Sequence, residues 1–269
     1  MSVIAVRPAA AFVEAGFRRW ATYRAAAVAG VFVNTVFGVI KLSILLAVAR
    51  SAGGTVAGYD PAALSTYAWV SQAMIALVMI FADTELADRV RTGDIAVDLA
   101  RPVDLQLSWL AADLGRAAWA LLSRGVAPIA FGAAFFGFHV PSDLTALALL
   151  VPSLVLAVMV SFALRFMLNL TAFWLTEVRG IVLLYVFTSG LLAGHLIPTQ
   201  LFPGWLHTLA YATPFPAIIQ TPIDLTTGLA TGAHALRLVA AQLAWAVVLL
   251  ALGRVVLARA TRRLVVQGG

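Results

Sequence analysis

The chain has 269 residues, of which 62% are hydrophobic and only 11% carry a charge, and its mean hydropathy is +0.97. Soluble domains carry about 25% charged residues, so this chain has too little polar surface to cover a water-soluble globule. The net charge of +6 does not indicate nucleic-acid binding, because the arginines cluster at the edges of apolar runs, where they set membrane topology. The absence of cysteine excludes disulfides and thiolate metal sites. We therefore expect an all-α integral membrane protein that forms a single transmembrane domain over residues 1–269.

The first predicted element is an amphipathic helix over residues 8–23. Phe17 and Trp20 lie on its apolar face, and Arg18 and Arg19 lie beside that face. An aromatic face flanked by arginines is typical of a helix that lies in the headgroup layer of a membrane. We therefore expect an interfacial helix; a soluble N-terminal helix is the alternative.

Six apolar runs follow, and each is read as a transmembrane helix. They cover roughly residues 25–48, 63–81, 117–138, 144–170, 181–194 and 236–257. The third run is entered through an amphipathic lead-in over residues 105–116. The fifth is short for a full crossing, which usually takes about 20 residues.

The segment at 195–232 is the least helix-like part of the chain. Five prolines fall within 25 residues, which rules out one continuous helix. The segment nevertheless stays apolar, and bare backbone in lipid would leave polar groups without hydrogen-bond partners. We expect re-entrant or interfacial helices packed against protein between the fifth and sixth runs.

Loop arginines indicate the orientation of the chain. Six crossings put both termini on one side, and most loop arginines fall on that side. They are Arg7, Arg18, Arg19, Arg24, Arg89, Arg91, Arg101, Arg179, Arg254, Arg259, Arg262 and Arg263. The other side keeps Arg50 and Arg237. Because cytoplasmic loops are enriched in Lys and Arg, we expect both termini in the cytoplasm.

A charged loop over residues 83–104 interrupts this apolar pattern. It holds six of the twelve carboxylates of the chain and three arginines. Asp83 or Thr84 is placed to cap a short helix that Gly93 ends, and Asp104 is placed to cap the next helix. We interpret the loop as an ordered cytoplasmic docking element; a solvated linker between two spans is the alternative.

Motifs for catalysis are missing from the sequence. There is no Gly-x-x-x-x-Gly-Lys phosphate loop, no His-Glu-x-x-His and no Gly-x-Ser-x-Gly, and the four histidines are scattered without metal-ligand spacing. We therefore do not expect an enzyme, a bound cofactor or a metal site in this chain.

Charged residues inside the predicted spans leave alternatives open. Lys41 either lines a translocation path, where it would attract an anionic group, or extends to the outer surface. Arg124 either pairs with Asp113 or a lipid headgroup, or lies deeper between helices. The middle of each predicted span has no Asp or Glu, which argues against an ion-coupled carrier.

Two local strings resemble a known family. They are Thr92-Gly93-Asp94-Ile95-Ala96-Val97-Asp98-Leu99-Ala100-Arg101-Pro102 and Gly194-x-x-Ile197-Pro198-x-x-x-Phe202-Pro203-x-Trp205-Leu206 with Pro214-Phe215. With these two strings, the predicted topology and the Val266-Gln267-Gly268-Gly269 ending, the chain resembles a type-2 ATP-binding-cassette exporter permease. The strings are similar to a bacterial subfamily described as uncharacterised or viologen-type exporter permeases.

The resemblance implies a mechanism. Two permease chains pair in the bacterial inner membrane, and a separate ATPase below each binds ATP and magnesium and drives transport through the loop between the second and third spans. The ATPase-coupling residues would be Glu85, Asp88, Arg89, Arg91, Gly93 and Asp94. The interfacial helix with Phe17, Arg18, Arg19 and Trp20 would also touch the ATPase. The substrate path would include Asn34, Lys41, Gln72 and Thr188.

From these expectations, the favoured function is export of an amphipathic or lipophilic compound, drug-like or lipid-like, by a heterodimer of this chain with a different permease. Export of a lipid-linked or polysaccharide substrate is the alternative within transport. An intramembrane transferase and a non-transporting membrane scaffold are alternatives of another class, and a transferase would need paired carboxylates or histidines at the membrane surface. Contacts with membrane lipids are expected, and contacts with nucleic acid are not.

Overall fold

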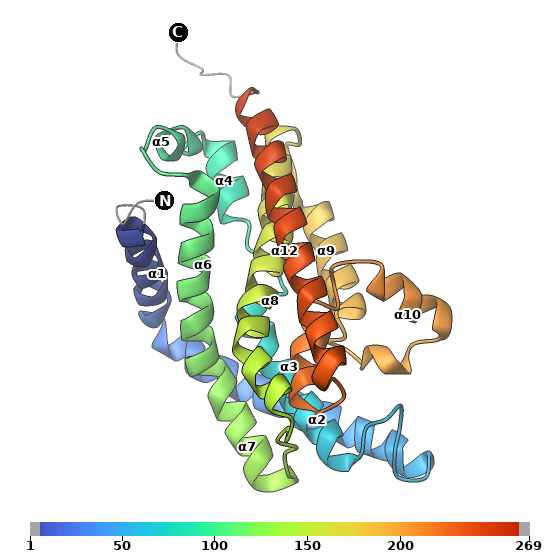
Figure 1. Ribbon diagram of the computed structural model, residues 1–269. Helices are drawn as coiled ribbons and strands as arrows, with labels where there is room; N and C mark the ends of the chain where they lie inside the picture. Colours follow the sequence, from blue (N-terminus) through green and yellow to red (C-terminus); the bar gives the residue numbers. More distant parts are fainter. Residues whose placement is uncertain (1–5, 264–269) are drawn as a thin grey trace.

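The computed structural model describes residues 6–263, and these form an all-helical fold in which no strand occurs (Figure 1). The predicted all-α class is confirmed for this part of the chain. The Val266–Gly269 ending lies outside the described residues.

Five helical stretches are long and apolar enough to cross a membrane, judged by length and composition. They are α2 (Arg24–Ser51), α3 (Pro61–Val78), the continuous stretch Leu105–Phe136, α8 (Leu144–Leu170) with the short η3 (Thr171–Phe173) after it, and α12 (Gly232–Thr261). The predicted fifth crossing corresponds to α9 (Arg179–Leu192), whose 14 residues make a shorter apolar helix. At a rise of about 1.5 Å per residue, α9 extends only about 21 Å, less than the roughly 30 Å of a bilayer core.

The predicted lead-in over residues 105–116 continues without a break into the third predicted span. The lead-in and the third span form one stretch made of α6 (Leu105–Ala120), a π-helical turn η2 (Leu121–Gly125) and α7 (Val126–Phe136). Asp113 and Arg116 lie within this stretch, and both side chains are buried against protein partners. Asp113 lies in the first third of this stretch, and the middle of the stretch has no Asp or Glu.

The N-terminal helix α1 (Val6–Ala21) runs alongside α6 (Figure 1). A Cβ atom at Gly16 would lie 2.0 Å from the carbonyl oxygen of Ala112, and one at Gly115 would lie 1.9 Å from that of Val13. Only glycine permits so close an approach of two helix backbones. The ring of Phe17 meets Trp119 edge to face at 5.4 Å, so part of the predicted interfacial face of α1 covers α6.

Helix α3 is the most buried of the long helices. Asp60 caps its first turn by accepting a hydrogen bond of 2.7 Å from the backbone N–H of Ala63. Leu64, Tyr67 and Trp69 are fully buried, because α3 packs against α2, α7, α8 and α11. Helices α8 and α12 pack along each other beside it. Residues of α3 and α8 together form much of the main hydrophobic cluster.

The segment between α9 and α12 is broken into short helices, as the prolines predicted. These are η4 (Thr199–Leu201), α10 (Gly204–Tyr211) and α11 (Gln220–Thr226). Pro198 and Pro203 directly precede η4 and α10, where the missing N–H of proline costs no helical hydrogen bond. Helix α11 packs against α8, α3 and α12, whereas α10 projects to the side of the bundle (Figure 1).

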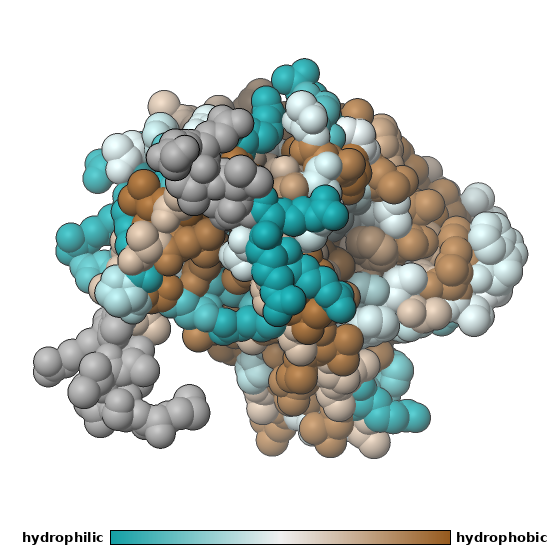
Figure 2. Space-filling view, turned by 90° about the horizontal axis from the view of Figure 1, so that it is seen from above, coloured by the Kyte–Doolittle hydropathy of each residue, from teal (hydrophilic) through white to brown (hydrophobic). Residues whose placement is uncertain are grey.

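The charged loop forms α4 (Glu85–Thr92) and α5 (Ile95–Leu99) at the end of the molecule where α12 also ends (Figure 1). Figure 2 views the molecule from this end. Hydrophilic side chains crowd the central and upper part of that surface, while hydrophobic side chains dominate its right and lower parts. This end therefore carries a concentration of hydrophilic side chains.

Candidate functional site

The charged loop is an ordered element whose caps match those predicted. Asp83 Oδ1 accepts a hydrogen bond of 2.9 Å from the N–H of Glu85 at the start of α4. Gly93 ends α4 in the left-handed region, with a φ of 85°. Asp104 Oδ1 accepts a hydrogen bond of 2.8 Å from the N–H of Leu107 and so begins α6. These contacts show that the loop is locally ordered.

Several charges of the loop are used in internal ion pairs. Glu85 pairs with Arg19 of α1 at 2.9 Å. Asp98, whose side chain is only 10% exposed, binds Arg89 at 2.6 Å and lies 3.6 Å from Arg101. These pairs join α4 to α1 and to α5, so Glu85 and Arg89 hold the element together and are less free to meet a partner than predicted.

The far end of the loop is attached to the last long helix. Asp104, besides capping α6, forms an ion pair with Arg254 of α12. On the other side, α4 packs against η3, which follows α8. The loop is therefore in contact with several long helices of the bundle.

The remaining predicted coupling residues lie on the surface. Asp88 and Arg91 are exposed and 3.4 Å apart, and Gly93 and Asp94 are exposed at the turn between α4 and α5. Val97 of α5 is 59% exposed near the same tip.

A hollow of about 230 Å³ lies beneath this surface, where α1, the charged loop and α6 meet. Its lining combines the paired charges Arg19, Glu85, Arg89 and Asp98 with the indole of Trp109. This mixture of ionic and aromatic groups gives the loop a concave side as well as an exposed tip.

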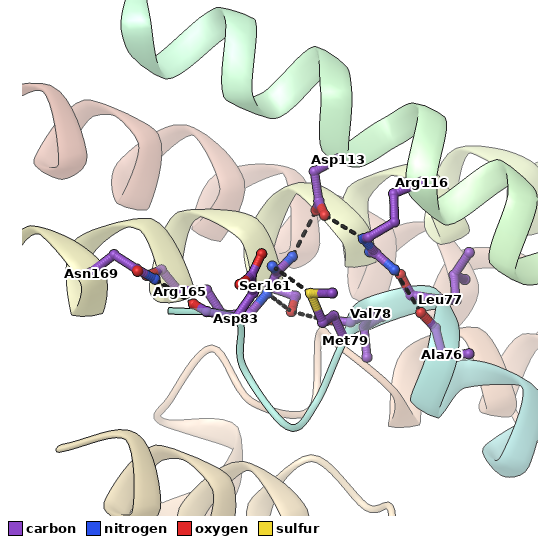
Figure 3. A network of polar contacts seen from close by, with 10 residues as sticks. All are labelled: Ala76, Leu77, Val78, Met79, Asp83, Asp113, Arg116, Ser161, Arg165 and Asn169. Atoms are coloured by element: carbon purple, nitrogen blue, oxygen red, sulfur yellow. Dashed lines mark hydrogen bonds and ion pairs between the residues drawn. The ribbon is translucent and has the colours of Figure 1, made fainter. Parts of the chain in front are cut away.

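A buried network of polar groups joins the charged loop to the spans (Figure 3). We call Asp113, Arg116, Ser161, Arg165 and Asn169 the inner network. Asp113 of α6 binds Arg116 at 2.6 Å and Arg165 of α8 at 2.7 Å. One carboxylate between two guanidinium groups neutralises part of their charge, which is essential at so buried a position.

The inner network also satisfies the carbonyl groups at the end of α3. Arg116 donates hydrogen bonds of 2.8 Å to Ala76 O and 2.7 Å to Leu77 O, and the hydroxyl of Ser161 donates to Val78 O. The last carbonyls of a helix have no partner within the helix and carry partial negative charge, so cationic donors stabilise them. The end of α3 is thus held by α6 and α8 together.

Asn169 extends this network to the charged loop. Its side-chain amide donates a hydrogen bond of 2.7 Å to Asp83 O and accepts one of 2.9 Å from the N–H of Ala87. One side chain of α8 therefore binds backbone groups on both sides of the start of α4. The arrangement fixes α4 relative to α3, α6 and α8.

Sequence reasoning missed the inner network. Asp113–Arg116 and Arg165–Asn169 have the spacings i,i+3 and i,i+4 that place two side chains on one helix face. That local signal is present, but the pairing of α6 with α8 is a long-range contact that spacing does not reveal. The alternative in which Arg124 pairs with Asp113 is wrong, because Arg124 instead donates a hydrogen bond of 3.2 Å to Ala26 O.

The predicted path residues lie partly together. The side-chain amide of Asn34 donates to Gln72 O at 3.4 Å, and Gln72 itself is buried. Thr188 is half-buried on α9 and has no side-chain hydrogen bond within the part of the chain that the structure describes. The structure thus brings together Asn34 and Gln72, but it does not join Thr188 to them.

Lys41 of α2 is bound by protein groups. Its ammonium group donates hydrogen bonds of 2.9 Å to Ser71 Oγ and 2.6 Å to His195 O, and it lies 5.7 Å from the centre of the Tyr67 ring. These contacts attach α2 to α3 and to the chain just after α9.

Comparison with known proteins identifies the family. The sequence profile of the ABC-2 family transporter proteins matches residues 36–268, which covers every long apolar helix from within α2 onward. No curated protein matches the chain. A profile match over most of the length, on an all-helical body with several apolar helices, indicates a multi-pass membrane permease. The chain belongs to the ABC-2 family of transporter proteins.

Proposed function

We propose that this chain, as a single permease domain, is the transmembrane subunit of an ATP-binding-cassette exporter. It moves an amphipathic or lipophilic compound out of the cytoplasm or the inner leaflet, and a separate ATPase drives it through residues 83–104. Permeases of the ABC-2 family normally work with such an ATPase subunit. The single observation that carries the proposal is the attachment of α4 to three long helices through the inner network.

That attachment suits the transmission of force. A displacement of α4 by a partner acts directly on Asn169 of α8 through two hydrogen bonds. Asp113 links α8 to α6, and Arg116 links α6 to the end of α3. Because packed interiors resist continuous deformation, a shift at the charged loop is expected to move these helices together.

The ATPase contact is proposed for the exposed residues of the charged loop. These are Asp88, Arg91, Gly93 and Asp94, with Val97 as an apolar contact. Glu85 and Arg89 contribute by keeping α4 in place through their ion pairs with Arg19 and Asp98. ATP and magnesium are bound by the ATPase.

The surroundings of the protein are proposed as follows. It lies in a bacterial inner membrane with both termini in the cytoplasm, belongs to the viologen-type exporter subfamily, and pairs with a second, different permease. Exposed apolar side chains on α2 and α9, such as Phe32, Phe37, Leu184 and Phe187, support contacts with lipid and with that second permease.

The same proposal includes two further sets of residues. The substrate path runs past Asn34, Lys41, Gln72 and Thr188. The ATPase also contacts α1 through Phe17, Arg18, Arg19 and Trp20.

The test is co-purification of the tagged chain from its native membrane, with export and ATP hydrolysis measured on the same complex. We expect an ATPase to accompany the chain. Replacing both Asp88 and Arg91 by alanine removes an exposed ion pair without leaving an unpaired charge, so we expect a folded variant with reduced export per ATP hydrolysed. The control is Arg50→Ala, which changes an exposed arginine in the last turn of α2, outside the charged loop. This variant should behave as wild type. An absent ATPase, or unchanged coupling in the double variant, would overturn the proposal.

A further inference from the structure

A second buried polar group lies near the other end of the molecule. We call Tyr59, Gln200, Gln220 and Asp224 the outer cluster. Asp224 of α11 is only 3% exposed, and its Oδ1 accepts hydrogen bonds of 2.6 Å from Gln220 Nε2 and 2.9 Å from Gln200 Nε2. The hydroxyl of Tyr59 lies 3.4 Å from the same oxygen. All of these partners are neutral.

Asp224 differs in this respect from Asp113 of the inner network. Asp113 is bound by two arginines, whereas no Lys, Arg or His nitrogen within residues 6–263 forms an ion pair with Asp224. A buried carboxylate without a cation carries a large desolvation cost, which disfavours its charged form. Burial accordingly raises the pKa of Asp224 to about 7, although the hydrogen bonds of its neighbours oppose this. Helix α11 belongs to none of the five long apolar helices.

The outer cluster joins parts of the chain that are far apart in sequence. Tyr59 lies just before α3, Gln200 lies in η4, and Gln220 begins α11. Gln220 Oε1 also accepts a hydrogen bond of 3.1 Å from the N–H of Thr199. The carboxyl of Asp224 is therefore the common acceptor for groups that attach the proline-broken segment to the outer end of α3.

Other titratable groups near Asp224 are tyrosines. Tyr59 and Tyr211 face its carboxyl, and Tyr67 of α3 is close enough to be affected by its charge. The residues of α8 and α12 that pack around α11 are apolar. His139 lies beside Gly228, four residues after Asp224. No cation on these elements replaces a proton on Asp224 within the described residues.

We propose that Asp224 is a proton-binding site, and that its protonated form holds the segment 195–226 closed over the outer end of α3. When this segment separates from α3, water reaches Asp224 and the carboxyl ionises readily. Opening therefore releases one proton, so acid favours the closed arrangement and alkali favours the open one. This inference does not rest on the ATPase contact, because it concerns only the outer cluster.

The direction of this pH dependence follows from the linkage between proton binding and opening of the segment. In the open arrangement the carboxyl has its ordinary pKa of about 4. Between that pKa and the higher one of the closed arrangement, each pH unit raises the opening constant about tenfold. Opening should therefore increase as the pH rises toward 7 and become constant above it.

The experiment uses the absence of native cysteine. Ala217→Cys places a thiol at a buried position of the outer segment, and Val140→Cys places one at an exposed position nearby. The full-length chain in lipid nanodiscs is labelled with a maleimide between pH 5.5 and 8.5, and the rate at position 217 is divided by the rate at position 140. This ratio removes the pH dependence of the thiol itself.

We expect the ratio to increase about tenfold per pH unit at the acidic end and to level off above pH 7. In Asp224→Asn, which cannot ionise, the tenfold increase per pH unit should be lost. Tyr59→Phe removes one hydrogen-bond donor that stabilises the charged carboxylate, so the labelling ratio should level off at a higher pH than in the wild type. This second variant tests the proposal if Asp224→Asn does not fold. A constant ratio in the wild type, or the same pH dependence in Asp224→Asn, would overturn the proposal.

Discussion

Asn169 Oδ1 accepts a hydrogen bond of 2.9 Å from the N–H of Ala87, and this bond joins the last turn of α8 to the first turn of α4. The same amide donates to Asp83 O at 2.7 Å. An apolar body with no phosphate-binding motif of its own thus has a polar loop attached to it by specific, buried contacts. The attachment makes the charged loop part of the bundle.

Replacing Asn169 by alanine should release the start of α4. The buried N–H of Ala87 would lose its partner, and leaving such a group unsatisfied costs roughly 1–3 kcal/mol. We expect the backbone amides of α4 to exchange hydrogen faster, as measured by mass spectrometry, while the exchange of α12 stays unchanged. Thr92→Ala, an exposed substitution at the end of the same helix, is the control. Equal protection of α4 in Asn169→Ala and Thr92→Ala would contradict the assigned role.

Asp113→Asn should destabilise the whole bundle. The substitution leaves Arg116 and Arg165 buried without their carboxylate, and removing one partner of a buried ion pair costs about 3–5 kcal/mol. We expect a clear fall in the thermal midpoint recorded by tryptophan fluorescence in detergent. Asp143→Asn alters the cap of α8 and a 3.3 Å hydrogen bond from the N–H of Gly232, and it should have a smaller effect. A midpoint that falls no further in Asp113→Asn than in Asp143→Asn would refute the burial argument.

Gly16→Leu should detach α1 from α6. The backbone of Ala112 occupies the space of a Cβ atom at residue 16, so the two helices must separate. Separation would also break the ion pair between Arg19 and Glu85. We expect a longer spin-label distance between α1 and α4 and a normal distance in Ala15→Leu, whose side chain is exposed. An unchanged distance in Gly16→Leu would show that the close approach does not hold α1.

Tyr67→Phe should weaken the contact between α3 and Gly194 while leaving the packing of the buried ring unchanged. The hydroxyl of Tyr67 donates a hydrogen bond of 2.8 Å to Gly194 O, and the residue is fully buried. Loss of that donor leaves a buried carbonyl without its partner, at a cost of about 1–3 kcal/mol. The thermal midpoint should fall, whereas Tyr23→Phe, which is exposed, should leave it unchanged. Equal midpoints for the two variants would be the contrary result.

Local chemistry made much of the charged loop predictable. The helix end at Gly93 and the cap at Asp104 follow from residue types that favour those positions, and both occur in the structure. The broken outer segment likewise follows from its prolines. These features depend on near neighbours in sequence, which is the information that a single chain displays.

Long-range pairing made the rest unpredictable. Asp113 and Arg116 are compensated by Arg165 and by the carbonyls of α3, which lie far from them in the sequence. The outer cluster was missed for the same reason. Asp224 and Gln220 have helical spacing, but Tyr59 and Gln200 come from elsewhere.

The central claim is that an ATPase acts on the spans through the tip of the charged loop. Photo-crosslinking from a single probe at Val97, which is 59% exposed at that tip, tests it in native membranes. The control probe is at Val140, which is 69% exposed on the opposite end of the bundle. The account predicts a crosslinked ATPase subunit from Val97 and none from Val140. Crosslinking to an ATPase from neither position, or from Val140 alone, would contradict it.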